Sequence, residues 1–448
     1  MHPTVILVIN FLLSLSFLIV LHELGHFIPA RLFKTRVEKF YLFFDIKYSL
    51  FKKKIGDTVY GIGWLPLGGY VKISGMIDES MDTEAMALPP QPWEFRSKPA
   101  WQRLIIMLGG VIVNVIVGFA IYIILILNLG GQQATGSDVK YGFGFPETLE
   151  KEGFKQGDQV LLVNGDTLDQ GRLLTQRLIF RNVKTVTVLR DGKPVTLNIS
   201  KDIGSKIFND GVAGALEPRV PFVVRDTEPG TPAAKMGIAP GDKLLNVAGY
   251  PIAYHTDFTY AMNHKATMDK PFDVVYVHQG DTITKEVSLK GQKKQQLGVY
   301  PKFTETDAVK VKQLSYSLSE SISKGIDRGY WAMSDYITQF KYVFTKKGAS
   351  QLGGFGTIAK LYPDTFDWIH FWETTAWISF VLAIMNILPI PALDGGHVTF
   401  LLYEIITGRK PGDKFLERAQ IIGILILLTL MVYANGNDLY KWIMERFF

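Results

Sequence analysis

The segment His22-Glu23-Leu24-Gly25-His26 has the residue types and the spacing of a metal-binding site that activates water. Residues four positions apart in a helix lie on one face, so His22 and His26 are able to bind the same Zn²⁺ ion. Glu23 then points at a water molecule on that ion, as a general base requires. The same pattern also arises by chance, and a polar cluster reaching for the membrane surface is the alternative. A catalytic zinc generally has three protein ligands, so a third is expected elsewhere.

A second polar segment, from Asn386 to His397, is the expected source of that ligand. Its carboxylate, Asp394, is an oxygen donor suited to Zn²⁺. Pro389 and Pro391 precede it and break any helix, which frees the carboxylate to face a partner. A simple helix cap is the alternative role for Asp394. His397 could also bind the metal, but a supporting position outside the ligand set fits it better, since two histidines are already available.

Four windows without Asp, Glu, Lys or Arg indicate which elements position these residues. They cover residues 4–21, 104–131, 374–393 and 419–437. Each has about the 17 to 25 residues that a helix needs to cross a bilayer. We therefore expect a multi-pass α-helical membrane protein with four transmembrane helices. The chain has 448 residues and no cysteine, which excludes disulfides and cysteine-ligated metals, and its 48 basic and 42 acidic residues do not indicate a nucleic-acid partner.

The basic residues after the first window predict the topology. The first window lacks a preceding positive charge and a cleavage site, so we interpret it as a retained helix and not a signal peptide. Residues 31–54 contain eight Lys or Arg and two acidic residues, and the positive-inside rule therefore places residues 34–100 in the cytoplasm. With four crossings, residues 132–371 and both termini lie outside. The two polar motifs then meet near the cytoplasmic face.

The outer region repeats itself at an offset of 84 residues. The segments Gly153–Gly165 and Gly237–Gly249 each place a Gly-Asp turn before an apolar run that ends with glycine. Such a repeat predicts two small β-rich domains. Their pattern resembles PDZ domains, which bind peptides at an exposed strand edge. Inert spacers are the alternative.

Two further segments are expected to form local structure. The run Gly61–Lys72 is apolar, glycine-rich and too short to cross a membrane as a helix, so it predicts a hairpin against the membrane helices or at a wet cleft. Between Ser315 and Lys347, apolar residues recur at helical spacing and predict an amphipathic helix packed through that stripe. The stripe comprises Tyr316, Ile322, Ile326, Tyr330, Met333, Ile337 and Phe340.

These expectations divide the chain into five parts. The first is a membrane part at 1–133, with helices at about 4–33 and 102–130 and the hairpin at about 55–76. Two PDZ-like domains follow at 134–218 and 219–304, and then an amphipathic linker at 305–371. The last is a membrane part at 372–448, with helices at about 373–393 and 417–437.

Taken together, these motifs resemble the site-2 protease family of M50-type intramembrane zinc metalloproteases, and within it the regulator-of-sigma-E (RseP) type with tandem PDZ domains. The resemblance covers essentially the whole chain. It implies roles for seven residues: His22, His26 and Asp394 as zinc ligands, Glu23 as the general base, and Asn386, Gly68 and Gly69 in substrate binding. The chain departs from the family pattern in three places, at Gly110–Asn114, Phe43–Asp45 and Gly353–Gly356.

The resemblance also implies a function. It indicates a zinc metalloendopeptidase of the bacterial inner membrane that cleaves transmembrane segments of single-pass proteins, such as anti-sigma factors and remnant signal peptides. The PDZ-like domains would lie outside the cytoplasm and bind peptide C-termini or screen substrates by size, with the active site near the cytoplasmic face. An inactive scaffold and a proton or metal transporter are the rival classes. The intact Glu23 argues against the first and the large repeated outer region against the second.

Overall fold

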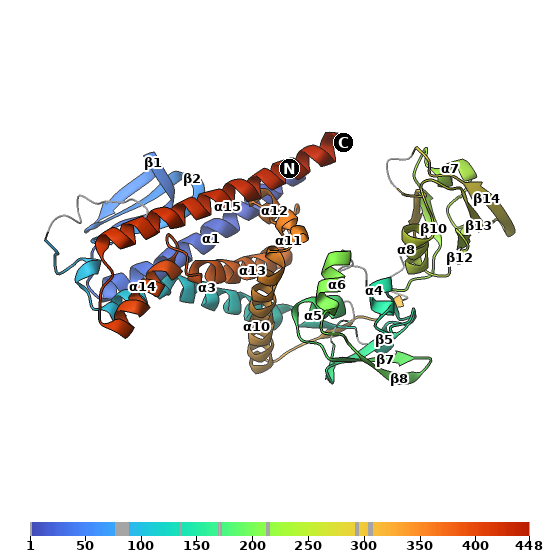
Figure 1. Ribbon diagram of the computed structural model, residues 1–448, viewed down its shortest axis with the longest axis horizontal. Coiled ribbons are helices and arrows are strands. Elements are labelled where there is room, and N and C mark those ends of the chain that lie inside the picture. The colour runs from blue at the N-terminus through green and yellow to red at the C-terminus, as the bar shows by residue number, and fades with distance from the viewer. Residues whose placement is uncertain are drawn as a thin grey trace. The chain divides into compact units, whose positions relative to one another are not determined.

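The computed structural model describes residues 2–76, 89–134, 136–168, 170, 173–211, 216–291, 295–302 and 308–447. The chain forms two compact units. One comprises Met1–Gly130 and Ser315–Phe448, and the other is Gly131–Leu314. In Figure 1 the first unit is coloured blue to teal and orange to red, and the second is largely green to yellow.

The first unit is mainly helical. Its helices are α1 (Pro3–Leu32), α3 (Ala100–Leu129), α10 (Leu318–Val343), α11 (Lys346–Gln351), α12 (Phe355–Ala359), α13 (Trp368–Ile387), α14 (Asp394–Thr407) and α15 (Asp413–Phe447), with a 3₁₀ turn at Phe95–Ser97. Among the described helices, three are long and apolar enough to cross a membrane: α1, α3 and the part of α15 from Lys414 to Met444.

The helix expected at about 373–393 differs from the prediction. Helix α13 begins earlier, at Trp368, so that it contains His370 and Glu373, and it is not among the three long apolar helices. It also ends at Ile387, six residues before the end of the charge-free window. The prolines at 389 and 391 explain the early end, because a proline disfavours helix at the residue before it and removes a backbone donor. The predicted span was therefore wrong at its C-terminal boundary.

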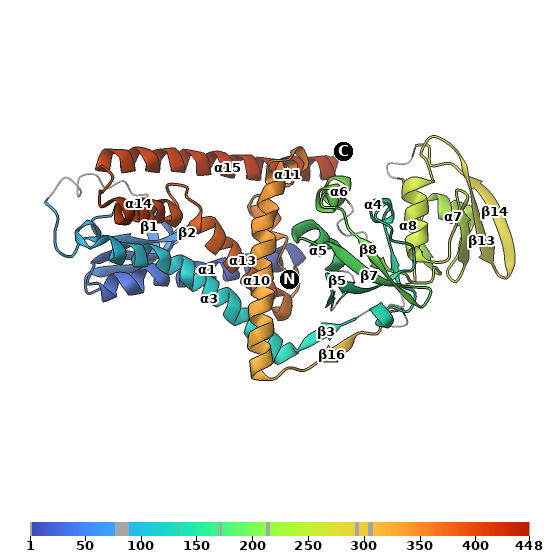
Figure 2. The same ribbon diagram turned by 60° about the horizontal axis from the view of Figure 1, so that its bottom comes forward.

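Helix α3 is the centre of the first unit and contacts α1, α10, α13 and α14 (Figures 1 and 2). Glycines allow the closest of these contacts. A Cβ atom on Gly109 would lie 1.9 Å from the carbonyl oxygen of Gly25 in α1, so the two backbones touch directly. The contact between α3 and α1 lies beside the histidines and brings α3 close to them.

Helix α10 lies where a helix was expected, between residues 315 and 347, but only part of the predicted stripe packs against the protein. Small residues of α10 make its contact with α3. A Cβ atom on Gly325 would lie 2.5 Å from the Ile123 side chain, and one on Gly329 would lie 2.4 Å from the Phe119 ring. Four residues of the predicted stripe are exposed: Ile322, Ile326, Tyr330 and Ile337. Met333 instead packs against the buried cluster that contains Phe380. The expectation that this stripe packs against the protein was therefore wrong for its exposed residues, because helical periodicity identifies an apolar face without identifying what covers it.

A strongly bent β-hairpin follows α1. It consists of β1 (Val37–Ile55) and β2 (Thr58–Ile73), joined at Gly56-Asp57. Residues 39–42 pair with 69–72 and also with 59–62, and 51–55 pair with 58–62. Four short segments therefore lie side by side, with residues 69–73 at one edge. The expected hairpin at 55–76 began too late, because β1 is rich in Lys and aromatic residues and lacks the glycines that marked β2.

The second unit contains two four-stranded sheets with the same strand order. The first has the order β6-β5-β7-β8 and the second β12-β11-β13-β14. Their strands are β5 (Gln159–Val163), β6 (Asp166–Thr167), β7 (Thr185–Arg190), β8 (Lys193–Asn198), β11 (Lys243–Val247), β12 (Tyr250–Pro251), β13 (Phe272–His278) and β14 (Asp281–Val287). Each sheet follows one of the two repeated Gly-Asp segments.

Smaller elements complete this unit. They are β3 (Gly131–Gln133), β4 (Phe143–Gly144), β9 (Glu217–Pro218), β10 (Val224–Thr227), β15 (Val299–Pro301), β16 (Lys312–Leu314), α4 (Glu147–Glu150), α5 (Leu174–Phe180), α6 (Ile203–Asp210), α7 (Pro232–Met236), α8 (His255–His264) and a 3₁₀ turn at Gly136–Asp138. Strands β3 and β16 pair where the chain enters and leaves the unit (Figure 2).

Candidate metal centre

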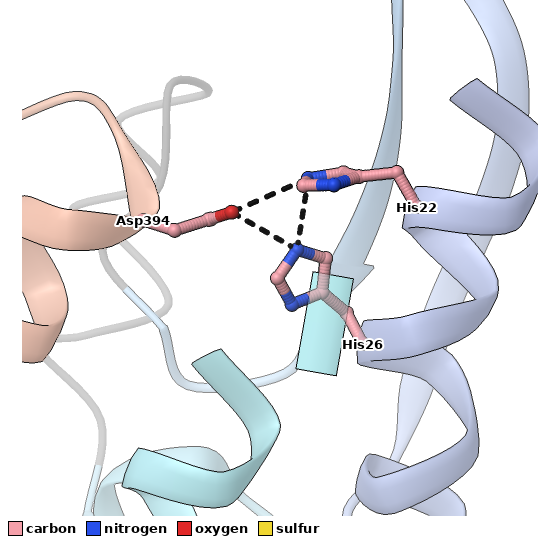
Figure 3. Close-up of side chains that lie close together, drawn as sticks. All are labelled: His22, His26 and Asp394. Carbon is pink, nitrogen blue, oxygen red and sulfur yellow. Dashed lines mark hydrogen bonds and ion pairs between the residues drawn. The ribbon is translucent and has the colours of Figure 1, made fainter. Parts of the chain in front are cut away.

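Three donor atoms from distant parts of the chain converge in the first unit (Figure 3). The Nε2 atom of His22 lies 3.2 Å from Oδ2 of Asp394, and Nε2 of His26 lies 3.3 Å from the same oxygen. The two Nε2 atoms are 3.2 Å apart. Both histidines come from α1, and Asp394 is the first residue of α14.

This donor set fits a zinc ion. Tetrahedral Zn²⁺ holds nitrogen and oxygen ligands at about 2.0–2.2 Å, which places neighbouring donor atoms roughly 3.3 Å apart. The three distances in the cluster match that separation. The Oδ2 atom of Asp394 is buried and has no hydrogen-bond partner among the described residues. A buried carboxylate oxygen without a hydrogen bond is costly unless a cation neutralises it.

His26 is oriented by a backbone carbonyl of α3. Its Nδ1 atom lies 2.8 Å from the carbonyl oxygen of Ile106. A carbonyl accepts, so Nδ1 carries the hydrogen and Nε2 presents its lone pair to the cluster. This arrangement, in which the second ring nitrogen is fixed by a hydrogen bond, is typical of metal-binding histidines.

His22 is oriented by Asn114, a buried residue of α3. The Nδ2 atom of Asn114 lies 3.1 Å from Nδ1 of His22, while its Oδ1 has no partner among the described residues. The two ends of an amide have nearly the same shape, and the assignment that satisfies more groups is preferred. With the amide reversed, Oδ1 accepts from Nδ1–H of His22, and Nε2 of His22 is free to bind metal. Ser379 holds Asn114 in place, because its hydroxyl donates to the backbone carbonyl oxygen of Asn114 at 2.7 Å.

Glycine makes room for the two imidazoles. A Cβ atom on Gly110 of α3 would lie 2.4 Å from Nε2 of His26 and 2.6 Å from Cε1 of His22. No side chain fits there without displacing a ring. The segment Gly110–Asn114 therefore combines a residue that leaves space for the histidines with a residue that orients one of them.

Glu23 lies beside the cluster and against the edge of the hairpin. Its side chain is buried, and the backbone N–H of Val71 in β2 donates to its carboxylate. A Cβ atom on Gly69 would lie 2.5 Å from Cγ2 of Ile19 and 3.5 Å from Cγ of Glu23. The edge segment 69–73 is therefore packed directly on α1 next to Glu23.

A cavity of about 610 Å³ contains the whole constellation. The sequence-predicted residues that border it are His22, Glu23, His26, Gly68, Gly69, Asn386, Asp394 and His397. Asn386 places Nδ2 3.4 Å from Nε2 of His22. His397 borders the cavity but is not part of the described group of three metal-binding donors.

A charged cluster at the rim of this cavity was not predicted. Asp45 accepts a hydrogen bond from the hydroxyl of Tyr70 at 2.7 Å and pairs with Lys39 at 3.4 Å. Burial alone would raise the pKa of Asp45, but the hydrogen bond and the ion pair outweigh burial and lower it. The Asp45 carboxylate therefore stays charged where the hairpin borders the cleft. The sequence did not place Asp45 at the cavity, because its position depends on how β1 folds back over β2.

Comparison with known proteins agrees with this geometry. The chain matches Peptidase family M50 over residues 10–430 and belongs to that family. It is 28% identical to the regulator of sigma-E protease RseP of Escherichia coli, over 96% of this chain and 97% of that protein. It is 26% identical to the regulator of sigma E protease of Haemophilus influenzae, over 96% of this chain and 98% of that protein. The protein is therefore a zinc metalloprotease of the site-2 protease family, and its cofactor is Zn²⁺.

Proposed function

We propose that this membrane protease cleaves transmembrane segments of single-pass membrane proteins at the site formed by His22, His26 and Asp394. The observation that carries the proposal is that these three donor atoms, from α1 and the start of α14, lie within 3.3 Å of one another. Glu23 lies in the same cavity. Anti-sigma factors whose outer part has been trimmed and remnant signal peptides are the expected substrates, as the likeness to regulators of sigma-E protease supports.

The side chains of the site have distinct tasks. Zinc, when bound, lowers the pKa of a water molecule and polarises the carbonyl group under attack. The carboxylate of Glu23 accepts the proton of the attacking water and delivers it to the leaving amine nitrogen. The Nδ2 group of Asn386 lies beside the cluster and donates to the developing oxyanion. Asn114 and the Ile106 carbonyl keep both imidazoles in the required tautomer.

The hairpin supplies the binding edge for an extended substrate. A peptide bond inside a helix is protected by its own hydrogen bonds, so the substrate must unwind before it is cleaved. Segment 69–73 is an edge of the sheet and lies against Glu23. Strand addition there holds the unwound segment by backbone hydrogen bonds. Gly68 and Gly69 have no side chains to obstruct its approach.

The membrane arrangement follows from the same proposal. We assign α13 as a fourth spanning helix beside α1, α3 and α15, with both termini facing outward and the metal centre near the cytoplasmic face of the bacterial inner membrane. The basic segment after α1 supports this orientation. The sheets of the second unit then lie outside the cytoplasm as two PDZ-like domains that select substrates by size or bind their C-termini.

Cleavage of a defined single-pass substrate tests the proposal. The purified full-length chain, loaded with zinc in detergent micelles, is incubated with a single-pass protein that lacks its outer domain, and mass spectrometry identifies the products. Cleavage inside the apolar segment that stops on addition of a zinc chelator is the expected result. Cleavage only in the polar flanks would contradict an intramembrane reaction, and metal binding without any cleavage would favour the scaffold or transporter class.

A further inference from the structure

Gln420 is a buried amide on a helix that otherwise exposes most of its apolar side chains. It is 4% exposed, whereas the next two residues, Ile421 and Ile422, are 39% and 57% exposed. A polar side chain at membrane depth requires a hydrogen-bond partner. Oε1 of Gln420 accepts from the backbone N–H of Ala392 at 3.1 Å.

Ala392 belongs to the loop that delivers Asp394 to the metal centre. The loop runs from residue 388 to 393, between α13 and α14. Ala392 has a φ of 78°, a left-handed conformation that is unfavourable for a residue with a Cβ atom. Such a conformation persists only when surrounding contacts hold it in place. The Gln420 amide is one such contact, two residues before the carboxylate.

The backbone of α15 also touches this loop. A Cβ atom on Gly423, one helical turn after Gln420, would lie 1.8 Å from the carbonyl oxygen of Pro391. Helix and loop are therefore in direct van der Waals contact on the same face that carries the hydrogen bond. Gln420 in addition borders the cavity that contains His22, Glu23 and Asp394.

We infer that Gln420 is a positioning residue for the metal centre: its carbonyl oxygen fixes the left-handed turn at Ala392 and thereby the direction of the Asp394 carboxylate. The inference rests on the proposed role of Asp394 as a zinc ligand. The distance from Oδ2 of Asp394 to both imidazoles is set by where α14 begins, and the loop before α14 has its amide at Ala392 held by Gln420. Without this acceptor, the turn relaxes and the third ligand moves away from the histidines.

Two substitutions of similar size separate the hydrogen bond from packing. Gln420→Met fills the same space without an acceptor for the Ala392 N–H. Gln420→Glu keeps a carbonyl oxygen, because burial favours the neutral carboxyl group. Thr429→Val, on an exposed position of the same helix, is the matched control for loss of a polar group. All are made in the full-length chain.

Four quantities are measured for each variant: zinc retention against a competing chelator, kcat and KM for a membrane-peptide substrate, and the thermal unfolding midpoint. Gln420→Met is expected to lose zinc about 10-fold to 100-fold more readily and to lower kcat by a similar factor, the range seen when residues that support metal ligands are replaced. KM and the unfolding midpoint should change little. Gln420→Glu should recover zinc retention to within about threefold of the parent.

The outcomes are distinguishable. Equal zinc retention in Gln420→Met and the parent chain, or equal loss in the Met and Glu variants, overturns the positioning role. A lower unfolding midpoint together with unchanged zinc retention also overturns it, because Gln420 would then serve packing alone. Failure of the parent chain itself to bind zinc or cleave would instead contradict the proposed function, independently of Gln420.

Discussion

Nε2 of His26 and Oδ2 of Asp394 lie 3.3 Å apart, although one belongs to the first helix of the chain and the other to α14. Hydrogen bonding within the protein does not explain why these two atoms lie so close together. The carboxylate oxygen is buried without a hydrogen bond among the described residues, and the imidazole is already fixed through its other nitrogen by Ile106. A shared cation would account for both features, and Zn²⁺ is the cofactor of this family.

Asp394→Ala should remove one of three zinc ligands, and zinc content and cleavage should therefore fall together. The loss should exceed the 10-fold to 100-fold typical of residues outside the ligand set. His397→Ala should cost no more than that range, because His397 borders the cavity without joining the group of three donors. Metal analysis of both purified variants checks the order. Equal zinc loss in the two variants would mean that the ligand set includes His397.

Asn114→Leu should weaken zinc binding by about 10-fold to 100-fold, because Nδ1 of His22 loses the partner that fixes its tautomer. Asn114→Asp keeps an oxygen acceptor and should retain most of the affinity. Asn128→Leu on the same helix is the control, since Asn128 bonds only to the backbone of its own helix in the described contacts. Zinc competition measures all three. A normal affinity for Asn114→Leu would remove Asn114 from the metal centre.

Gly69→Ala should lower kcat/KM by about 10²-fold without loss of zinc. The new methyl group would lie 2.5 Å from Ile19 and 2.8 Å from the Tyr41 carbonyl, so the edge segment must move away from Glu23, and displacements of about 1 Å have effects of this size. Gly412→Ala, outside the site, is the matched control, because the added methyl group meets nothing within 4 Å among the described residues. Similar rates for both variants would argue against this edge as the substrate site.

Deletion of residues 134–304 tests the role of the second unit. The deletion keeps β3 and β16, whose pairing places Gln133 opposite Lys312 and so provides a short connection. The three donors of the metal centre, as found among the described residues, all lie outside the deleted region, and zinc binding should persist. A size filter predicts that the shortened chain cleaves a substrate whose outer domain is intact, which the full chain leaves uncut.

A recruiting role predicts the opposite pattern for the same deletion. Cleavage of trimmed substrates should slow, and intact substrates should remain uncut. Rates for both substrates in both chains distinguish the two roles. Unchanged rates in all four combinations would leave the sheets as spacers.

Sequence reasoning anticipated the parts of the site that depend on local spacing. His22 and His26 share a helix face because of the helical period, and the prolines before Asp394 indicated a break that turns the chain toward them. The distance between Asp394 and the histidines could not be predicted from the sequence, because it depends on how α3 packs against α1 and α14. Asn114 and Gln420 were missed as functional residues for the same reason. An amide within an apolar window was the available signal for both, but Asn128, Asn435 and Asn437 give the same signal.

Hydropathy predicted the long apolar helices correctly, but the sequence did not predict where the chain bends back on itself. The long apolar windows corresponded to α1, α3 and α15. The bend in β1 folds the hairpin into four paired segments. It depends on a left-handed backbone conformation at Phe43 and Lys47, which phenylalanine and lysine do not predict. Similarly, α10 packs through Gly325 and Gly329, whereas its apolar residues Ile322, Ile326 and Ile337 stay exposed.

Glu23→Gln with zinc content and turnover measured on the same preparation tests the central claim most directly. The amide keeps the size of the side chain but cannot accept the proton of water. We predict one zinc ion per chain, as in the parent, and turnover of a membrane substrate reduced by at least about 10²-fold to 10⁴-fold. Normal turnover with zinc retained would contradict the role of Glu23 as the base.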